Sequence, residues 1–142
     1  MDNSDGYSNN FLIDSDFECE YLLMLKECEN TIIDFLNTSE INDDEKCIIY
    51  EKVKGYKLIK RIEDLKIGSY IRWFLLNENN ISEKNYFGIL CKIFKSDKGI
   101  FILCKNFMHR HYTFKFNECV IFQKLTKKEL MLIDLLHYIE SN

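Results

Sequence analysis

The apolar positions divide the chain into a helical first part and a strand-rich second part. Between residues 15 and 37 apolar residues recur at spacings of three and four, the period of one helix face. This stripe predicts an amphipathic acidic helix over residues 15–37, after a flexible acidic tail at residues 1–14 and before a polar linker at residues 38–46. We expect the stripe to pack on the rest of the domain, to meet a partner helix or to form a self-association seam.

From residue 47 onward, short segments rich in apolar residues alternate with turn residues. The expected strands cover residues 47–53, 56–62, 69–76, 86–94, 100–104, 110–116 and 119–123. The last two are expected to form a hairpin around a short turn at residues 117–118. Short, evenly spaced strands are typical of a small antiparallel barrel, so the predicted fold class is α+β with a small β-barrel at residues 47–125.

A second helix is expected at the C-terminal end of the sequence. Thr126 and Glu129 have the spacing of a capping box, and the apolar residues that follow form a broad face. We therefore expect a C-terminal capping helix at residues 126–142 that covers an open end of the barrel and shields its strand edges.

Charge is distributed unevenly along the chain. The overall net charge is −4, but residues 1–46 carry 13 acidic and 2 basic side chains, whereas residues 47–142 carry 10 acidic and 17 basic ones. The basic part could meet phosphate or an acidic protein surface. The acidic part could dock on the basic part, or compete with nucleic acid for it. Two solvated surfaces of different composition are the alternative.

Several functional classes lack a sequence signal. No apolar run is long enough to span a membrane, and the first residues do not resemble a secretory signal. The five glycines are isolated, and no phosphate-binding, hydrolase or metalloprotease motif occurs. We therefore expect a protein that is not an enzyme, takes no cofactor and no small-molecule substrate, and does not bind membranes.

The six cysteines are expected to be core thiols. No CxxC pair exists, and Cys91, Cys104 and Cys119 lie within apolar runs, where cysteine behaves as a small hydrophobic residue. A metal site or a thiol–imidazole pair built from Cys104, His109 and His111 is the chemical alternative. A disulfide is a further alternative if the protein matures in an oxidising assembly.

Residues 105–116 interleave basic and aromatic side chains. On a strand they divide into a basic face, with His109, His111, Thr113 and Lys115, and an aromatic face, with Arg110, Tyr112, Phe114 and Phe116. A basic face beside aromatic residues suits single-stranded nucleic acid, through phosphate neutralisation and base stacking. It suits equally a barrel strand with one buried and one wet face. The candidate binding residues here are Lys105, His109, Arg110, His111 and Lys115.

A second aromatic group surrounds Arg72. Strand alternation places Tyr70, Arg72 and Phe74 on one face and Trp73 on the other, so Trp73 is predicted to be a core residue. Tyr70 and Arg72 are candidate binding residues, because an exposed aromatic ring beside an arginine can receive a peptide, a modified lysine or a base. A packed hydrophobic pair is the alternative.

Three segments between residues 62 and 126 resemble a small β-barrel unit of SH3-like or Tudor-like type. The matching positions are Ile67, Gly68, Tyr70, Ile71, Arg72, Trp73 and Phe74, then Gly88 and Leu90, then Ile121, Phe122, Lys124 and Leu125. The pattern is similar to barrel domains encoded by nucleocytoplasmic large DNA viruses, in which a glycine usually stands where this chain has Phe87. The resemblance implies an SH3-like barrel in a non-enzymatic viral protein, acting in the virion or in the viral factory of the host cytoplasm.

The leading functional hypothesis is therefore a binding or scaffold module. Its basic, aromatic barrel face would contact nucleic acid or a viral protein partner, while residues 15–37 mediate self-association. One alternative is a purely structural virion protein, a minor capsid or core component without nucleic-acid binding. The other is the metal protein or enzyme that uses Cys104, His109 and His111.

Overall fold

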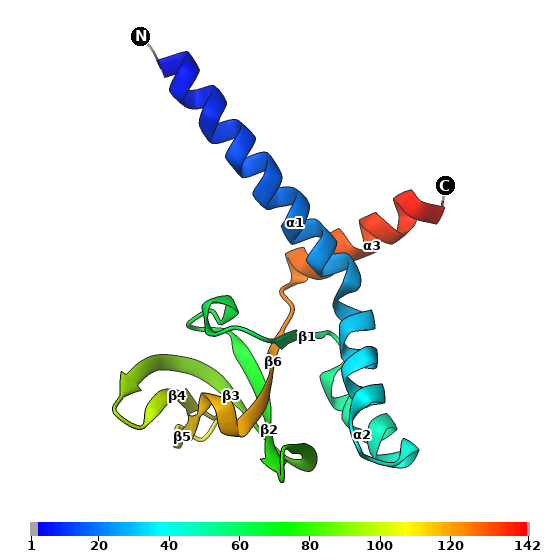
Figure 1. The fold of residues 1–142 in the computed structure, drawn as a ribbon, viewed down its shortest axis with the longest axis vertical. Coiled ribbons are helices and arrows are strands. Elements are labelled where there is room, and N and C mark those ends of the chain that lie inside the picture. Colours follow the sequence, from blue (N-terminus) through cyan, green and yellow to red (C-terminus); the bar gives the residue numbers. More distant parts are fainter. Residues whose placement is uncertain (1–2, 142) are drawn as a thin grey trace. The chain divides into compact units, whose positions relative to one another are not determined.

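The structure is a computed structural model that describes residues 3–141, with side chains from residue 19 onward. Within these residues the chain forms three α-helices and six strands (Figure 1). The helices are α1 (Asn3–Thr38), α2 (Asp43–Val53) and α3 (Lys127–Ser141), and the 3₁₀ helices are η1 (Ile62–Asp64) and η2 (Phe116–Glu118). The strands are β1 (Tyr56–Ile59), β2 (Tyr70–Asn77), β3 (Asn80–Ser96), β4 (Gly99–Lys105), β5 (His111–Lys115) and β6 (Cys119–Lys124).

The chain divides into two compact units. One comprises Met1–Cys28 with Thr126–Asn142, and the other comprises Glu29–Leu125. All six strands belong to the second unit, which holds a single antiparallel sheet in the order β1-β6-β2-β3-β4-β5. The predicted α+β class with an antiparallel sheet is confirmed.

The expected closure of this sheet into a barrel is not found. In the described residues β1 and β5 are the two ends of the sheet, and each has a single strand neighbour. The chain leaves β5 through η2 and then pairs β6 with β2 and β1. The predicted hairpin of residues 110–116 with residues 119–123 is therefore wrong, because the 3₁₀ turn separates the two strands and β6 pairs between β1 and β2.

One face of the sheet carries the main hydrophobic core, which we call the inner core. Ile71 and Trp73 of β2 contribute to it by strand alternation, and Trp73 is 2% exposed, as the sequence predicts. The long strand β3 curves around this core (Figure 1), with an irregularity in its pairing with β4 between Leu90 and Lys92. The buried members of the inner core are Ile59, Leu65, Ile71, Trp73, Leu90, Ile102, Cys104, Cys119 and Ile121.

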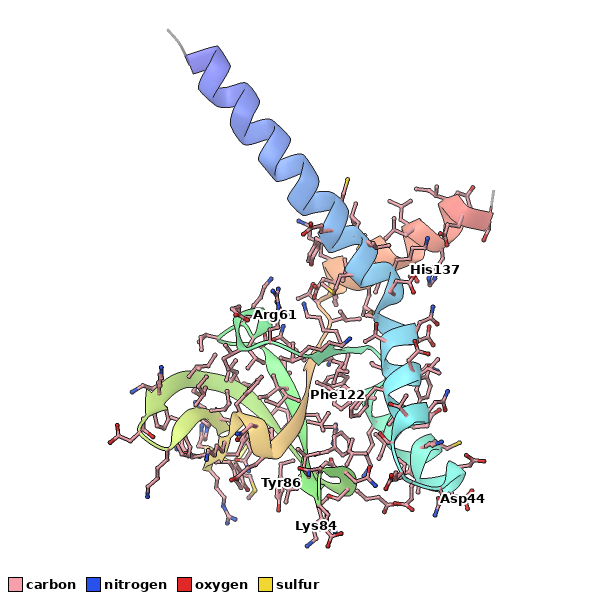
Figure 2. All side chains as sticks on the ribbon, in the orientation of Figure 1. Asp44, Arg61, Lys84, Tyr86, Phe122 and His137 are labelled. Atoms are coloured by element: carbon pink, nitrogen blue, oxygen red, sulfur yellow. The ribbon has the colours of Figure 1, made fainter. Side chains whose placement is uncertain are left out.

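A second core lies on the opposite face, over β2 and β6, and is closed by helices. Phe74 and Phe122 meet edge to face with ring centroids 5.6 Å apart, and Ile32 and Leu36 of α1 join their cluster. Figure 2 shows Phe122 on the side of β6 that faces α2. The predicted packing of the α1 stripe onto the rest of the domain is thereby confirmed for its C-terminal half.

Residues 43–53 form a helix, so the predicted strand over residues 47–53 is wrong. The side chain of Asn42 accepts a hydrogen bond from the Glu45 backbone N–H, and three acidic residues occupy the first turn, an arrangement that favours the helix N-terminus. Ile49 and Val53, one turn apart, are buried in the second core. The expected linker at residues 38–46 therefore contains a helix cap, and the sheet begins at β1.

The terminal segments also differ from expectation. Helix α1 begins at Asn3, so residues 3–14 are helical where a flexible tail was expected. Helix α3 forms as predicted, and Thr126 and Glu129 make the reciprocal bonds of a capping box. It belongs to the same compact unit as the first part of α1. Within that unit the Tyr21 hydroxyl donates to Glu129 at 2.6 Å, and Lys26 pairs with Glu140.

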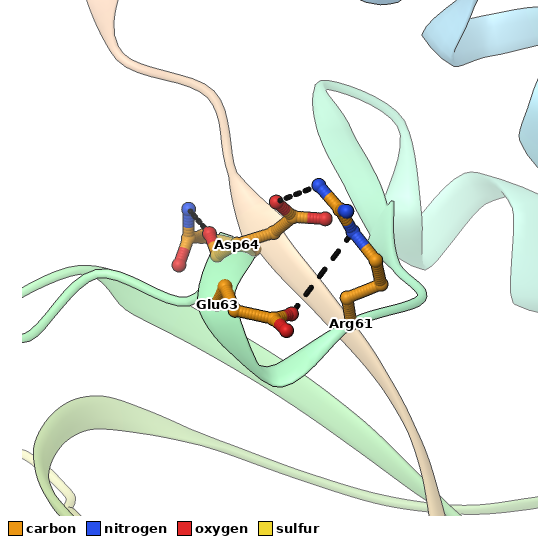
Figure 3. A network of polar contacts seen from close by, with 4 residues as sticks. Arg61, Glu63 and Asp64 are labelled. Atoms are coloured by element: carbon orange, nitrogen blue, oxygen red, sulfur yellow. Dashed lines mark hydrogen bonds and ion pairs between the residues drawn. The ribbon is translucent and has the colours of Figure 1, made fainter.

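Two local features fix the ends of β2. At its C-terminal end, Glu78 and Asn79 both have positive φ, which suits a two-residue hairpin turn into β3. At its N-terminal end, the buried Gln123 side chain accepts from the Lys66 backbone N–H at 2.9 Å and holds the η1 segment against β6. Figure 3 shows this segment, where Arg61 pairs with Glu63 and Asp64. Among the described residues no helix is both long and apolar enough to cross a membrane.

Candidate nucleic-acid interface

The face of strands β2–β5 opposite the inner core is called the outer face here. Residues that pair across antiparallel strands share a face, so the register groups the outward side chains into rows, and four of these rows follow the Phe74–Asn85 pair. The rows are Arg72 and Phe87; Tyr70, Ile89, Lys105 and His111; Lys92, Leu103 and Thr113; and Phe94, Phe101 and Lys115. The four strands thus carry one connected basic and aromatic surface.

The four rows contain cations and no carboxylate. Arg72, Lys92, Lys105 and Lys115 lie in these rows, and none of the twelve row residues is Asp or Glu. The ion pairs within the described side chains involve Lys26, Lys46 and Arg61, which lie outside these rows. The charges of the outer face are therefore not neutralised by neighbouring acidic side chains, and the surface is suited to an anionic ligand.

Three aromatic rings form a first stacking cluster on this face. Tyr70 and Phe87 stack with ring centroids 5.8 Å apart and planes 10° apart, and Phe107 lies 5.4 Å from Phe87 and 6.4 Å from Tyr70. Phe107 is 70% exposed and Tyr70 is 38% exposed, so the cluster is open to solvent. The Lys124 ammonium lies 5.6 Å above the Tyr70 ring.

A shallow hollow adjoins the first stacking cluster. Gly88 is one of its lining residues, and an added Cβ there would lie 2.9 Å from the backbone oxygen of Lys105. A side chain at this position would push β3 away from β4, so glycine keeps the strands close and the hollow open. Lys105 and Asn106 form part of its wall.

Arg72 extends the first stacking cluster with a partly buried positive charge. Its guanidinium lies 5.3 Å from the centroid of the Phe87 ring, and its Nη1 donates to the Asn85 side chain at 2.6 Å. The buried Nε has no hydrogen-bond partner. A guanidinium held by one neutral acceptor and one ring keeps most of its positive potential, because no anion among the described residues compensates it.

A second stacking cluster lies farther along the same face, on the hairpin of β3 and β4. Phe94 and Phe101 are cross-strand partners and stack with ring centroids 5.6 Å apart. The Lys92 ammonium lies 5.6 Å from the centroid of the Phe94 ring. Lys115 of β5 pairs with Phe101, so a second cation belongs to the same row. Each stacking cluster therefore combines rings with nearby positive charge.

The loop between β4 and β5 presents Phe107. The Asn106 side chain accepts hydrogen bonds from the backbone N–H groups of Met108 and Arg110, and His109 has a positive φ of 60°. His109 and Arg110 thus lie in a tight loop and not on the strand, so their predicted alternation with residues 111–116 is wrong. Both side chains are exposed. The remaining alternation is confirmed, because His111 and Lys115 face outward while Tyr112 and Phe114 pack on the inner core.

The structure brings together part of the predicted site. Tyr70, Arg72 and Lys105 meet around the first stacking cluster, and His111 occupies the same row as Tyr70 and Lys105. Lys115 belongs to the row of the second cluster. The residues that sequence reasoning missed are Phe87, Lys92, Phe94, Phe101, Phe107 and Lys124. Alternation within β3 and β4 could have placed Phe87, Lys92, Phe94 and Phe101, whereas Phe107 and Lys124 reach the cluster only through the fold.

The proposed metal or thiol–imidazole set is not assembled. Cys104 pairs with Tyr112 and is fully buried in the inner core, whereas His111 lies on the outer face. Burial raises the pKa of the Cys104 thiol to about 12, and the electrostatic effect of Cys91 also raises this pKa. Burial also raises the pKa of Cys119 to about 11. Such thiols are poor nucleophiles and poor metal ligands, because both roles require the thiolate.

The sequence matches no protein-family model, and comparisons with curated proteins and with solved structures found no match either.

Proposed function

We propose that this chain is a non-enzymatic binding module whose outer face contacts nucleic acid. One observation carries the proposal: two solvent-accessible aromatic stacks lie on four neighbouring rows that hold four lysine and arginine side chains and no carboxylate. Phosphates are attracted by such a face, and bases can stack on its rings. An acidic protein surface would use the charges but would not need the exposed rings.

We also propose that the sheet is an open variant of the SH3-like barrel that the sequence resembles. The order β6-β2-β3-β4-β5, the long curved β3 and the 3₁₀ turn between β5 and β6 support this assignment. The virus-encoded origin, and action in the virion or the viral factory, rest on the sequence resemblance only and stay a prediction.

The proposal is tested by the salt dependence of binding to a labelled oligonucleotide. Release of counterions predicts that the logarithm of the affinity falls linearly with the logarithm of the salt concentration, by about 0.7 for each phosphate contact with a single strand. Fluorescence anisotropy with the full chain and labelled oligo-dT, between about 50 and 200 mM salt, measures this slope. If no complex forms even at the lowest salt concentration, the proposal is wrong.

A charge-reversal pair identifies the face that binds. Lys105→Glu with Lys115→Glu should weaken binding at least tenfold and make the salt slope shallower, because two phosphate contacts become repulsive. The matched control is Lys127→Glu with Lys128→Glu, which reverses two exposed charges at the start of α3, in the other unit. Equal losses in the two variants would mean that net charge and not the outer face governs binding. Circular dichroism confirms that both variants fold.

A purely structural role through self-association is the second candidate function. It is favoured by exposed apolar side chains on α3, where Met131, Leu135 and Tyr138 are spaced by four and three residues, as along the seam of a helix pair. Light scattering coupled to size exclusion tests it through the mass in solution. A monomer at high concentration removes this candidate, whereas an oligomer that Leu135→Glu dissolves supports it.

A further inference from the structure

The two stacking clusters lie on one face but are separated along the strands. Phe87 of the first cluster and Phe94 of the second belong to the same strand. Their rows are three steps of strand alternation apart: two are counted on β4, from Lys105 to Phe101, and one on β3, from Ile89 to Phe87. Six residues of extended chain cover about 20 Å, since a strand rises about 3.3 Å per residue. Lys105 lies in the row of Tyr70 and Lys92 lies in the next row, so positive charge continues from one cluster to the other.

Resting on the proposed function, we propose that the outer face binds single-stranded nucleic acid as one continuous site of about five to seven nucleotides that spans both stacking clusters. A strand stacked as in B-form DNA advances about 3.4 Å per nucleotide, so up to about seven nucleotides cover 20 Å. A more extended strand covers the same distance with fewer nucleotides. One base stacks on the first cluster, one stacks on the second, and the phosphates between them lie along Lys105 and Lys92.

Exposed rings favour a single strand over a duplex. In a duplex each base is stacked between its neighbours, so Tyr70, Phe107 and Phe94 would find no free base surface, and only the lysines would contact the phosphates. In a single strand the bases are free to unstack and lie on the rings. The rings are open enough for this contact, because Phe107 is 70% exposed and Phe94 is 36% exposed.

The length of the site distinguishes a continuous site from a single stacking pocket, because the two predict different dependences of affinity on oligonucleotide length. A lone pocket at the first cluster would bind one or two nucleotides, and a longer oligonucleotide would gain only from the larger number of equivalent binding positions. A continuous site gains a second stacked base as soon as the oligonucleotide reaches the second cluster. The affinity should therefore rise steeply with length and then level off.

The test is a length series of labelled oligo-dT, with two, four, six, eight and twelve nucleotides, bound to the full chain at fixed salt. We expect the affinity to rise by at least tenfold between two and six nucleotides and by less than threefold between eight and twelve. A duplex of twelve base pairs and poly-glutamate serve as competitors. Both should displace the eight-nucleotide strand at least tenfold less effectively than unlabelled oligo-dT of the same length.

Variants at each cluster show whether both are used. Phe94→Ala should weaken binding of the eight-nucleotide strand roughly tenfold and binding of the two-nucleotide strand less than twofold, because a short strand can use the first cluster alone. Tyr70→Ala with Phe107→Ala should weaken both lengths. The control is Tyr138→Ala, which removes an aromatic ring that is 69% exposed on α3, in the other unit, and should leave all affinities unchanged. The fluorescence of Trp73, the single tryptophan, reports that each variant folds.

The outcomes distinguish this inference from the proposed function. If the oligonucleotides bind with an affinity that is flat beyond two nucleotides, or if Phe94→Ala has no effect at any length, the continuous site is wrong while the nucleic-acid function remains. If the duplex or poly-glutamate competes as well as the single strand, charge alone explains binding and the inference is wrong. If no oligonucleotide binds, both the inference and the proposed function fail.

Discussion

Two aromatic clusters lie on opposite faces of β2. They consist of similar residue types but differ in the exposure and in the neighbours of their rings. In the inner cluster Trp73 stacks on Phe114 at a centroid distance of 4.5 Å, and Tyr86 and Tyr112 complete the group. The first stacking cluster on the outer face consists of Tyr70, Phe87 and Phe107. Trp73 and Tyr70 are three residues apart in sequence, yet one is buried and the other is exposed.

The difference lies in the neighbours of the rings. Trp73, Tyr112 and Phe114 of the inner cluster pack on one another and on aliphatic side chains of the inner core, so their burial contributes to stability, whereas Tyr86 is 42% exposed. In the first stacking cluster, Phe87 is in contact with the Arg72 guanidinium and Tyr70 with the Lys124 ammonium, and part of the ring surface is open to solvent. Exposed rings with cations contribute little to the free energy of folding but can stabilise a complex with a ligand. The comparison therefore predicts opposite effects of substitution on stability and on binding.

The largest expected effect is on stability, at the centre of the inner cluster. Trp73→Ala should lower the free energy of unfolding by about 3–5 kcal/mol, because it leaves a large cavity among close-packed rings. Tyr70→Ala, on the outer face, should cost less than about 1 kcal/mol. Urea denaturation followed by circular dichroism measures both. Similar costs for the two substitutions would remove the distinction between the faces.

Gly88→Ala should have the next largest effect. The added methyl group meets the Lys105 backbone oxygen, so β3 and β4 must shift, and we expect a loss of about 1–3 kcal/mol in the free energy of unfolding. Gly68→Ala is a useful comparison, since a Cβ there meets no atom within 4 Å and any cost comes from its positive φ. If Gly88→Ala is neutral in thermal denaturation, the strands are not as close as described and the hollow loses its structural basis.

The buried thiol predicts a pH dependence. Because burial raises the pKa of Cys104 to about 12 from an ordinary value of 9.0, the unfolded chain loses this proton first. The resulting stabilisation is fully present below pH 9 and decreases as the pH rises towards 12. Between pH 8 and pH 10 the free energy of unfolding should therefore decrease in the parent protein more than in Cys104→Ala. The difference between the two decreases should reach about 1 kcal/mol. The same decrease in both proteins would show that the thiol ionises freely in the fold.

The smallest effect on stability is expected at the second stacking cluster. Phe94→Ala should change the free energy of unfolding by only about 0.5 kcal/mol, because the ring lies at the surface and its ring and cation contacts are with Phe101 and Lys92. Differential scanning calorimetry measures this change. A loss of several kcal/mol would show that the outer rings are part of the core, and the binding assays with this variant would then need a smaller substitution, such as Phe94→Leu.

Part of the fold could be predicted from local sequence patterns alone. Helical spacing predicted α1 around residues 15–37, alternation predicted β2 and the burial of Trp73, and the capping box predicted the start of α3. The prediction failed for α2, because a short apolar run such as that of residues 47–53 fits a strand and a helix equally well. Asn42 and the acidic residues that follow it are typical of a helix N-terminus, but the polar composition of residues 38–46 equally fits a linker.

The candidate site was predicted only in part, for a similar reason. The basic and aromatic stretch of β5 was visible as a pattern, and His111 and Lys115 do lie on the outer face. The positive φ of His109 and the tight loop around Asn106 could not be inferred from alternation, so the prediction of strand faces for His109 and Arg110 is wrong. Nor could alternation within one strand show that Phe107 and Lys124, from distant segments, meet Tyr70.

The sequence by itself therefore determined which side chains of each strand share a face, because the period of a strand is a property of the backbone. It also determined which helices carry an apolar stripe. Only the tertiary structure decided the order of the strands, the connection through η2 in place of a hairpin, and the grouping of α3 with the first part of α1. These depend on contacts between residues far apart in the chain, and the meeting of two aromatic clusters and their cations on one face is a result of those contacts.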